Sequence, residues 1–316
     1  MPKVSIIIPA YNALEYLPQA LASVDNQGFN DFEVIIINDG SSDGIEEWFK
    51  QHIQDAKYRL ITQTNQGISG ARNRGVQASQ GDYIAFLDAD DMWAPSKLEQ
   101  QVACLDHNPT TALVHTWLAM VDVTGKATGR VLQSQAQGQV YESLLLQNDV
   151  ACASVMVRRH CFEQVGEFDR DLLSMEDWDM WIRMAQHYQF AVIPEALTFY
   201  RQVPTSLTKD CRQMERAFDL VIEKSFQAAP AALKGLRPLT CGYANFCLAW
   251  KALQSVAQDA RLASHYHLKG LRAAPKLLFS RENLRLSLAI AMMATLGGNG
   301  YDQALDYVNG LRRRTA

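Results

Sequence analysis

The stretch YIAFLDADDMW, residues 83–93, begins as a strongly apolar run and ends abruptly in acids. A short and nearly continuous apolar run is typical of a strand that is buried on both faces of a parallel sheet. The acids that follow it are Asp88, Asp90 and Asp91. Because like charges this close repel one another, we expect a cation to bind at the end of this strand.

Three similar apolar runs precede this one, at residues 4–9, 32–39 and 58–63. Helical patterns lie between them. Leu17, Leu21 and Val24 fall on one helical stripe, and residues 45–53 repeat apolar side chains at the same spacing. Strands that alternate with helices predict an α/β fold with a mostly parallel sheet flanked by helices.

Two shorter patterns concern the helices of this region. Ala71, Gly75 and Ala78 would give one helix a face of small residues, which favours close packing. Asp43 and Glu46 have the spacing of a capping box before the helix at residues 45–53.

The rest of the chain separates into two regions. Helical patterns follow Pro95 and recur near residues 177–188, and strand patterns continue at residues 111–122, 151–159 and 197–202. Beyond residue 205 the pattern is helical and rich in Ala and Leu. We therefore predict a domain at residues 1–205 and a helical appendage at 206–316, with the boundary near Pro204.

The helical appendage carries an apolar stripe beside the basic residues Lys276, Arg281 and Arg285; the stripe includes Leu277, Leu284, Leu288 and Met292. The appendage could cover the acceptor side of a site, join subunits into a homo-oligomer, or contact a membrane surface peripherally. An ordinary packed helical subdomain explains the same pattern equally well.

Polar residues follow three of the predicted strands, which is where ligands bind in open α/β sheets. The stretches are PAYN at 9–12, NDGSSD at 38–43 and DADD at 88–91. We expect them to converge, since the carboxyl ends of parallel strands meet at one edge. The Asp39 carboxylate could accept a hydrogen bond from a base N–H or a ribose hydroxyl, although a capped turn alone would explain Asp43 and the serines.

Asp88 and Asp90 are two residues apart, so both side chains would point the same way from a strand end. Such a pair suits Mg²⁺ or Mn²⁺, with the phosphates of a substrate completing the coordination shell. Asp91 alone would serve as the N-cap of the next helix, but a cap requires one acid and not three.

Two further charged clusters lie near predicted helix starts. NQGISGARNRG, residues 65–75, places Arg72 where a phosphate could bind, although exposed helical arginines are common. SMEDWDMW, residues 174–181, combines three acids with two tryptophans. A carboxylate there could act as a general base on a sugar held by aromatic faces, while acids at a helix start also simply favour the helix dipole.

The composition is that of an ordinary globular protein, with 316 residues of which 48% are hydrophobic and 20% charged. A net charge of −4 argues against a nucleic-acid binder. The six cysteines form no CxxC pair. No segment resembles a signal peptide or reaches the about 18 apolar residues of a spanning helix. We expect a reduced protein of the cytoplasm, which could lie peripherally at the inner face of the membrane.

Taken together, these motifs resemble those of the family 2 glycosyltransferases, inverting enzymes of the GT-A fold. The matching stretches occur in the family's order between residue 4 and about residue 208: VSIIIPAYN, IIINDGSSDG, NQGISGARNRG, YIAFLDADDMWAPSKLEQQV, GEFDRDLLSMEDWDMWIRMA and FYRQVPTSLT. The chain beyond them does not match, so the resemblance implies no role for the helical appendage.

The resemblance implies a role for each motif. Asp88 and Asp90 would be the DXD motif that holds Mn²⁺ or Mg²⁺, and Asp177 would be the catalytic base. Glu176 and Trp178 would shape the acceptor site. The residues around the nucleotide would be Pro9, Tyr11, Asn12, Asp39, Ser42, Arg72, Asp88 and Ala89.

The implied reaction is the metal-dependent transfer of a sugar from a nucleoside-diphosphate sugar, most often a UDP-sugar in this family. The acceptor would be a hydroxyl of a glycan, a lipid-linked or another acceptor, in the synthesis of cell-surface polysaccharides or glycoconjugates. Asp177 would take the acceptor proton in a single displacement that inverts the anomeric configuration. Arg201, in the FYRQ element, could approach the diphosphate.

Two alternatives stay open. A nucleotidyltransferase acting on sugar phosphates would need a Gly-rich, Arg-containing loop after the first strand, where this chain reads PAYNALEYL. A non-catalytic homologue that only binds a sugar nucleotide or a glycan would be free to lose Asp88, Asp90 and Asp177, all of which are present.

Overall fold

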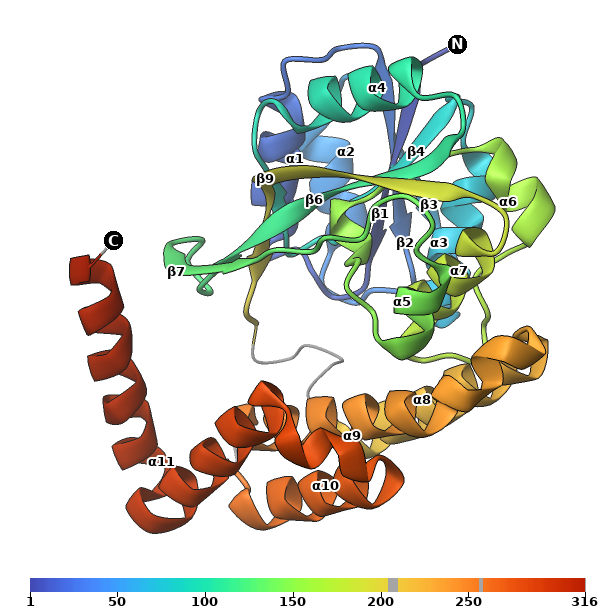
Figure 1. Cartoon of the computed structure of the whole chain (residues 1–316). Helices are drawn as coiled ribbons and strands as arrows, with labels where there is room; N and C mark the ends of the chain where they lie inside the picture. Colours follow the sequence, from blue (N-terminus) through green and yellow to red (C-terminus); the bar gives the residue numbers. More distant parts are fainter. Residues whose placement is uncertain (204–209, 256–257, 316) are drawn as a thin grey trace. The chain divides into compact units, whose positions relative to one another are not determined.

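The computed structural model describes residues 1–203, 210–255 and 258–315. The chain divides into two compact units (Figure 1). The first comprises Met1–Leu144 and Asn148–Ser206, and the second comprises Leu145–Gln147 and Leu207–Ala316. The predicted boundary near Pro204 lies outside the described residues.

The first unit is built on a nine-stranded sheet in the order β3-β2-β1-β4-β8-β6-β9-β5, with β7 paired to β6. One half is parallel and consists of β1 (Val4–Ala10), β2 (Phe32–Asn38), β3 (Tyr58–Thr62) and β4 (Tyr83–Phe86). The other half consists of β5 (Met92–Trp93), β6 (Thr111–Val121), β7 (Ala127–Leu132), β8 (Met156–Arg158) and β9 (Gln189–Arg201). In this half only β6 and β9 pair in parallel, so the expected α/β fold is confirmed with its parallel strands gathered on one side.

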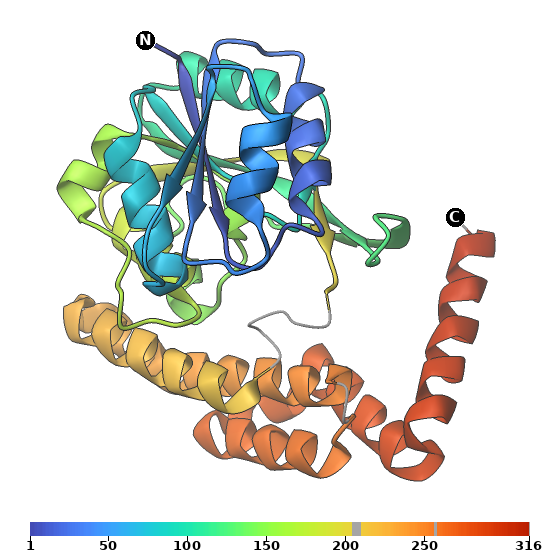
Figure 2. The ribbon, with the colours of Figure 1, turned by 180° about the vertical axis from the view of Figure 1, so that it is seen from behind.

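Helices cover both faces of the parallel strands because each strand is apolar on both sides. Val4 and Ile6 of β1 share a core with α1 (Leu17–Asp25), α2 (Ile45–His52) and α4 (Lys97–His107). Ile7 points the other way, toward α3 (Gly67–Ala78). Figure 2 shows α3 on the opposite side of the strands from α1 and α2. The remaining helices of this unit are α6 (His160–Val165), α7 (Glu176–Ala185) and the part of α5 (Tyr141–Leu146) that extends to Leu144.

The predicted small-residue face of α3 is confirmed at its centre. A Cβ atom added to Gly75 would lie 2.3 Å from Cγ2 of Ile7, so only a glycine lets the helix approach β1 this closely. Ala71, one turn earlier, is buried against Ile35 and Ile37 of the neighbouring strand β2.

Two local predictions are wrong, and one predicted strand is longer than expected. Residues 151–159 do not form one strand, because a 3₁₀ turn at Cys152–Ser154 precedes β8. The strand expected at 197–202 is the end of the longer β9. The capping box before α2 is absent, because the N-cap is Gly44 in the left-handed conformation and the Asp43 carboxylate accepts from the Leu14 amide instead.

The second unit is helical, as expected. Its elements are α8 (Cys211–Ala228), η3 (Ala231–Leu236), α9 (Arg237–Gln254), α10 (Ala260–Ala273), η4 (Pro275–Phe279) and α11 (Arg281–Thr315). Helices α9 and α10 cross at Gly242 and Gly270, where added Cβ atoms would meet the opposing helix. Helix α11 breaks at Gly297, which has a positive φ of 66°. Among the described helices, none combines the length and the apolar character needed to cross a bilayer.

Candidate active site

The predicted polar stretches meet at the carboxyl edge of the parallel strands. β1 lies between β2 and β4, and Ala10 is in register with Asn38. The backbone carbonyl of Ala10 accepts from the amide of Asp39 at 2.9 Å, and the amide of Leu87 donates to Ile7 O at 3.0 Å. The loops after these three strands therefore start from neighbouring points, as the topology requires.

The loops after β1 and β2 are tied together by short polar contacts. The amide of Asn12, which has a positive φ of 49°, donates to Ser41 Oγ at 3.0 Å. Its side-chain oxygen accepts from the Ser42 amide at 2.8 Å. The ring of Tyr11 beside it is exposed, whereas Pro9 is buried within β1.

Asp39 is buried at the end of β2 and holds the loop after β3. One of its carboxylate oxygens accepts from Gln63 Nε2 and from the Gln66 amide, both at 2.8 Å. The two glutamines carry no sequence signal that would have singled them out. They border a cavity of about 350 Å³, which is also lined by Thr62, Gly70, Arg74, Gln77 and Arg170.

The acids after β4 lie in a turn and not on the strand. β4 ends at Phe86, and the amide of Asp91 donates to the carbonyl of Asp88 at 3.0 Å. The prediction that Asp88 and Asp90 share a face through strand periodicity is therefore wrong, since neither residue lies on β4. The two carboxylates still interact across the turn: burial, and then the charge of Asp88, raises the pKa of Asp90. Ala89 between them is buried.

Asp91 does not cap the following helix. Helix α4 begins at Lys97 with Ser96 as its N-cap, and Asp91 Oδ1 instead accepts from the amide of Arg201 at 2.9 Å. The Arg201 side chain is buried and donates to the Asp90 carbonyl at 2.7 Å. It also donates to Val123 O and to Gln19 Oε1, both at 2.8 Å. Arg201 thus fixes the acidic turn against β9.

Arg72 links the acidic turn to the start of α7. Its buried guanidinium donates to Asp88 Oδ1 at 2.8 Å through Nη2 and forms an ion pair with Glu176 through Nη1. The Arg72 Nε is buried and has no partner among the described residues. Arg72, which the family resemblance places near the nucleotide, therefore bridges two acids. One is Asp88 of the acidic turn and the other is Glu176 of α7.

Asp177 follows Glu176 at the start of α7. Its Oδ1 accepts from Asn148 Nδ2 at 3.2 Å and from the Trp178 amide at 2.7 Å. Burial, and then the charge of Glu176, raises the pKa of Asp177 to about 7. Asn148 was not predicted, because the loop that carries it has no motif.

Trp178 lies in the core and not on the surface of the site. Its side chain is buried and its indole N–H donates to Leu144 O. The Trp181 indole is also buried and donates to Val150 O at 3.0 Å. The two tryptophans therefore anchor α7, and the structure does not place their rings where a sugar could stack on them.

The residues of the acidic turn fit a divalent cation. Burial, and then the charge of Asp88, raises the pKa of Asp90 to about 6, while burial first and Asp90 second raise the pKa of Asp91. The Asp91 Oδ2 atom is buried without a hydrogen-bond partner in the described structure. In the same part of the chain no three His, Cys or acidic side chains form a complete metal cage. One or two carboxylates with phosphate oxygens would be the usual coordination of Mg²⁺.

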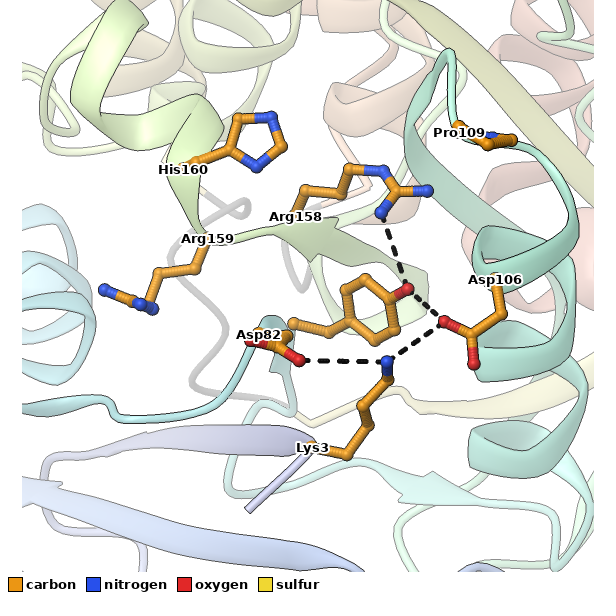
Figure 3. Close-up of a pocket in the computed structure, with 8 residues that line it drawn as sticks. Lys3, Asp82, Asp106, Pro109, Arg158, Arg159 and His160 are labelled. Atoms are coloured by element: carbon orange, nitrogen blue, oxygen red, sulfur yellow. Dashed lines mark hydrogen bonds and ion pairs between the residues drawn. The ribbon is translucent and has the colours of Figure 1, made fainter. Parts of the chain in front are cut away.

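A larger cavity, of about 430 Å³, lies at the opposite ends of the strands (Figure 3). Its cations already have partners. Lys3 contacts Asp106 at 3.1 Å and Asp82 at 3.7 Å, and Arg158 donates to backbone carbonyls and to the Tyr83 hydroxyl. We place the candidate active site at the acidic edge because the convergent charges lie there, although the larger of these two cavities lies at the opposite ends of the strands.

Residues 5–166, just over half of the chain, match the profile of the family described as Glycosyl transferase family 2. An uncharacterized glycosyltransferase of Rickettsia bellii is 34% identical over 199 residues, which cover 63% of this chain and 29% of the relative. The putative teichuronic acid biosynthesis glycosyltransferase TuaG of Bacillus subtilis is 29% identical over 213 residues, which cover 66% of this chain and 82% of the relative. The chain thus spans less than a third of the length of the Rickettsia relative.

Two solved structures have a similar fold. The mannosyltransferase PcManGT of Pyrobaculum calidifontis, in complex with GDP-Man and Mn²⁺, has a TM-score of 0.60 at 18% identity, covering 94% of this chain and 87% of that one. Residues 1–349 of S. aureus TarS, in complex with UDP-GlcNAc, have a TM-score of 0.56 at 15% identity, covering 93% and 92%. These likenesses establish the expected GT-A fold.

Proposed function

Because the chain belongs to glycosyl transferase family 2, we propose that it transfers a sugar from a nucleoside-diphosphate sugar to an acceptor hydroxyl with inversion at the anomeric carbon. The observation that carries this proposal is the contact of Arg72 with both Asp88 and Glu176. This contact brings the acidic turn after β4, the proposed donor side, against the start of α7, the proposed acceptor side. Family 2 chemistry requires these two halves to be adjacent.

Asp177 is the general base of the proposed reaction. Its carboxylate takes the proton from the acceptor hydroxyl while the hydroxyl oxygen attacks the anomeric carbon. The bond between that carbon and the diphosphate oxygen breaks, and the electron pair leaves with the nucleoside diphosphate. A base whose pKa is about 7 is well matched to proton transfer at neutral pH.

Asp88 and Asp90 would hold Mn²⁺ or Mg²⁺ together with the donor diphosphate. When bound, the cation neutralises the charge that develops on the leaving diphosphate. Asp90 is the stronger candidate for direct contact, because the Asp88 carboxylate already accepts from Arg72.

The nucleotide would lie over the loops after β1 and β2. The exposed Tyr11 ring could stack on the base, and the loop held by Asn12 and Ser42 could contact the ribose. The buried Asp39 carboxylate could accept from a base N–H if Gln63 released it. We propose a UDP-sugar as the donor, although PcManGT was solved with GDP-Man and TarS with UDP-GlcNAc.

The acceptor is proposed to be a hydroxyl of a growing glycan or of a lipid-linked intermediate in the synthesis of a cell-surface polysaccharide. The name of the B. subtilis relative, which refers to teichuronic acid biosynthesis, supports this class. Glu176 would orient the acceptor or simply hold Arg72.

Substitution of the base tests the proposed function. Asp177→Asn keeps the shape of the side chain but cannot accept a proton, so turnover should fall by about 10²- to 10⁴-fold with donor binding nearly unchanged. Asp171→Asn, which changes an exposed acid in the same unit, is the matched control. Transfer can be followed as nucleoside diphosphate release, and donor affinity by calorimetry.

Glu176→Gln separates the two acids at the start of α7. If it abolishes turnover while Asp177→Asn leaves turnover near normal, the role of base belongs to Glu176. If neither Asp177→Asn nor Glu176→Gln affects transfer, the reaction does not use this site.

A further inference from the structure

The first half of α11 exposes large apolar side chains on its outward face. Leu284 is 71% exposed and Leu288 is 60% exposed. The short turn before the helix ends in Phe279, which is 91% exposed. Single exposed apolar side chains are ordinary, but three large ones between residues 279 and 288 indicate a surface that another apolar phase covers.

This exposure is not a consequence of a poorly packed helix. At about 100° per residue, Leu284 and Leu288 lie about 40° apart on the helix. Leu286, Ala289 and Met293 lie about 140° to 200° away from Leu284, and all three are buried. The inward face is therefore complete, and the outward leucines make no contribution to it.

Cations accompany the outward leucines. Arg281 and Arg285 lie about 60° and 100° from Leu284 on the same helix, and both are exposed. Arg272 and Lys276, just before the helix, are exposed as well. We call the surface formed by Arg281, Leu284, Arg285 and Leu288 the α11 face.

Acids are excluded from the α11 face. Residues 271–296 contain four cations and one acid, Glu282, in a chain whose net charge is −4. Glu282 lies on the inward side of the helix, where it accepts from the Trp250 indole N–H at 2.6 Å. It reaches the face through an ion pair with Arg285 at 3.4 Å. The α11 face is therefore both apolar and positively charged.

We propose that the α11 face docks on the surface of an anionic lipid bilayer. A helix that presents leucines with arginines beside them matches the interfacial pattern, in which the apolar side chains enter the acyl region and the cations meet lipid phosphates. A second copy of the chain is a poorer partner. In a two-fold interface the same patch meets itself, so the arginines would face arginines without acids to compensate them.

Vesicle binding by the full chain tests this inference and does not depend on glycosyl transfer. The purified protein should sediment with vesicles of phosphatidylcholine and phosphatidylglycerol, much less with phosphatidylcholine alone, and less at high salt. Leu284→Ser combined with Leu288→Ser should reduce the partition coefficient by about tenfold or more. Arg281→Glu with Arg285→Glu, which reverses both cations of the α11 face, should have a similar effect on anionic vesicles.

Two control variants match these changes. Leu220→Ser removes an exposed leucine from α8. Lys126→Glu with Arg130→Glu reverses two exposed cations around β7, at residues outside the α11 face. Both should bind anionic vesicles like the parent protein, and circular dichroism should show that every variant is folded.

Three results would overturn the proposal. They are the absence of binding to either kind of vesicle, binding that the leucine variants leave unchanged, and a self-association in sedimentation experiments that the leucine variants abolish. The last result would assign the α11 face to a second copy of the chain.

Discussion

At the scale of single residues, the properties of Asp177 depend on charges supplied by other segments. Burial and Glu176 raise its pKa, and the positive charge of Arg72 lowers it. Cys152 interacts with the same charged groups. Burial raises the pKa of its thiol, the charge of Arg72 lowers this pKa, and the charge of Asp177 raises it. Arg72 thus holds Asp88 and Glu176 in place and lowers the pKa of Asp177, the proposed base.

The pH dependence of transfer should report this balance. A base that must be ionised gives a rate that rises with pH, so kcat/KM should increase through about pH 7 and then level off. Arg72→Gln removes the charge that lowers the pKa of Asp177 and should move the rising limb to higher pH. Arg72→Lys keeps the charge but loses the double contact, so activity should fall with the limb in place.

These two variants separate electrostatics from folding. A loss of activity in Arg72→Gln with an unshifted limb would mean that the limb does not belong to Asp177. Thermal unfolding of both variants shows how much of the effect is structural, because removing one partner of a buried ion pair leaves the other charge uncompensated.

The raised pKa of Asp177 should also make the stability of the protein depend on pH, in the direction opposite to that of the rate. The pKa of Asp177 is raised on folding, so its contribution to stability is fully present below about pH 4 and is lost as the pH rises through about 7. Asp177→Asn should therefore raise the melting temperature at pH 8 and give no gain at pH 4. A gain that is equal at both values would exclude an ionised Asp177 as its cause.

At the scale of elements, the sequence predicts what depends on periodicity and misses what depends on distant partners. The strands of the parallel half and helices α1 to α4 follow from apolar spacing. The bond between Arg72 and Glu176 joins residues 104 positions apart, and no local pattern contains it. Because Asp88 and Asp90 directly follow an apolar run, the sequence predicts a strand end where the structure has a turn.

One added methyl group should disrupt the close contact between helix α3 and strand β1. Gly75→Ala would place a Cβ 2.3 Å from Ile7, so the helix or the isoleucine must move. We expect a loss of about 1 to 3 kcal/mol in the free energy of unfolding, measured with urea. Gly235→Ala, where the added Cβ meets nothing within 4 Å, is the control and should be nearly neutral. Equal effects at the two sites would contradict the close approach.

At the scale of the whole molecule, negative charge is gathered at the edge where parallel strands end. Asp88, Asp90 and Asp91 come from one turn, and Glu176 and Asp177 come from the start of α7. Arg72 and Arg201 contact these segments, and Arg201 also donates to the backbone carbonyls of Asp90 and Val123. The site therefore has an excess of negative charge that a bound cation would compensate.

Ligand-induced stabilisation tests that compensation in the complete chain. A donor at about 100-fold its dissociation constant should stabilise the protein by about 2.7 kcal/mol, which raises the melting temperature measurably. We expect UDP-sugars with Mn²⁺ to give this shift and the same sugars with a chelator to give little or none. Asp90→Asn should abolish the difference made by Mn²⁺, whereas Asp82→Asn, an exposed acid at the opposite ends of the strands, should preserve it. A donor that stabilises the parent protein equally with chelator present would contradict the metal assignment, and a shift with GDP-sugars alone would correct the proposed donor while leaving the site in place.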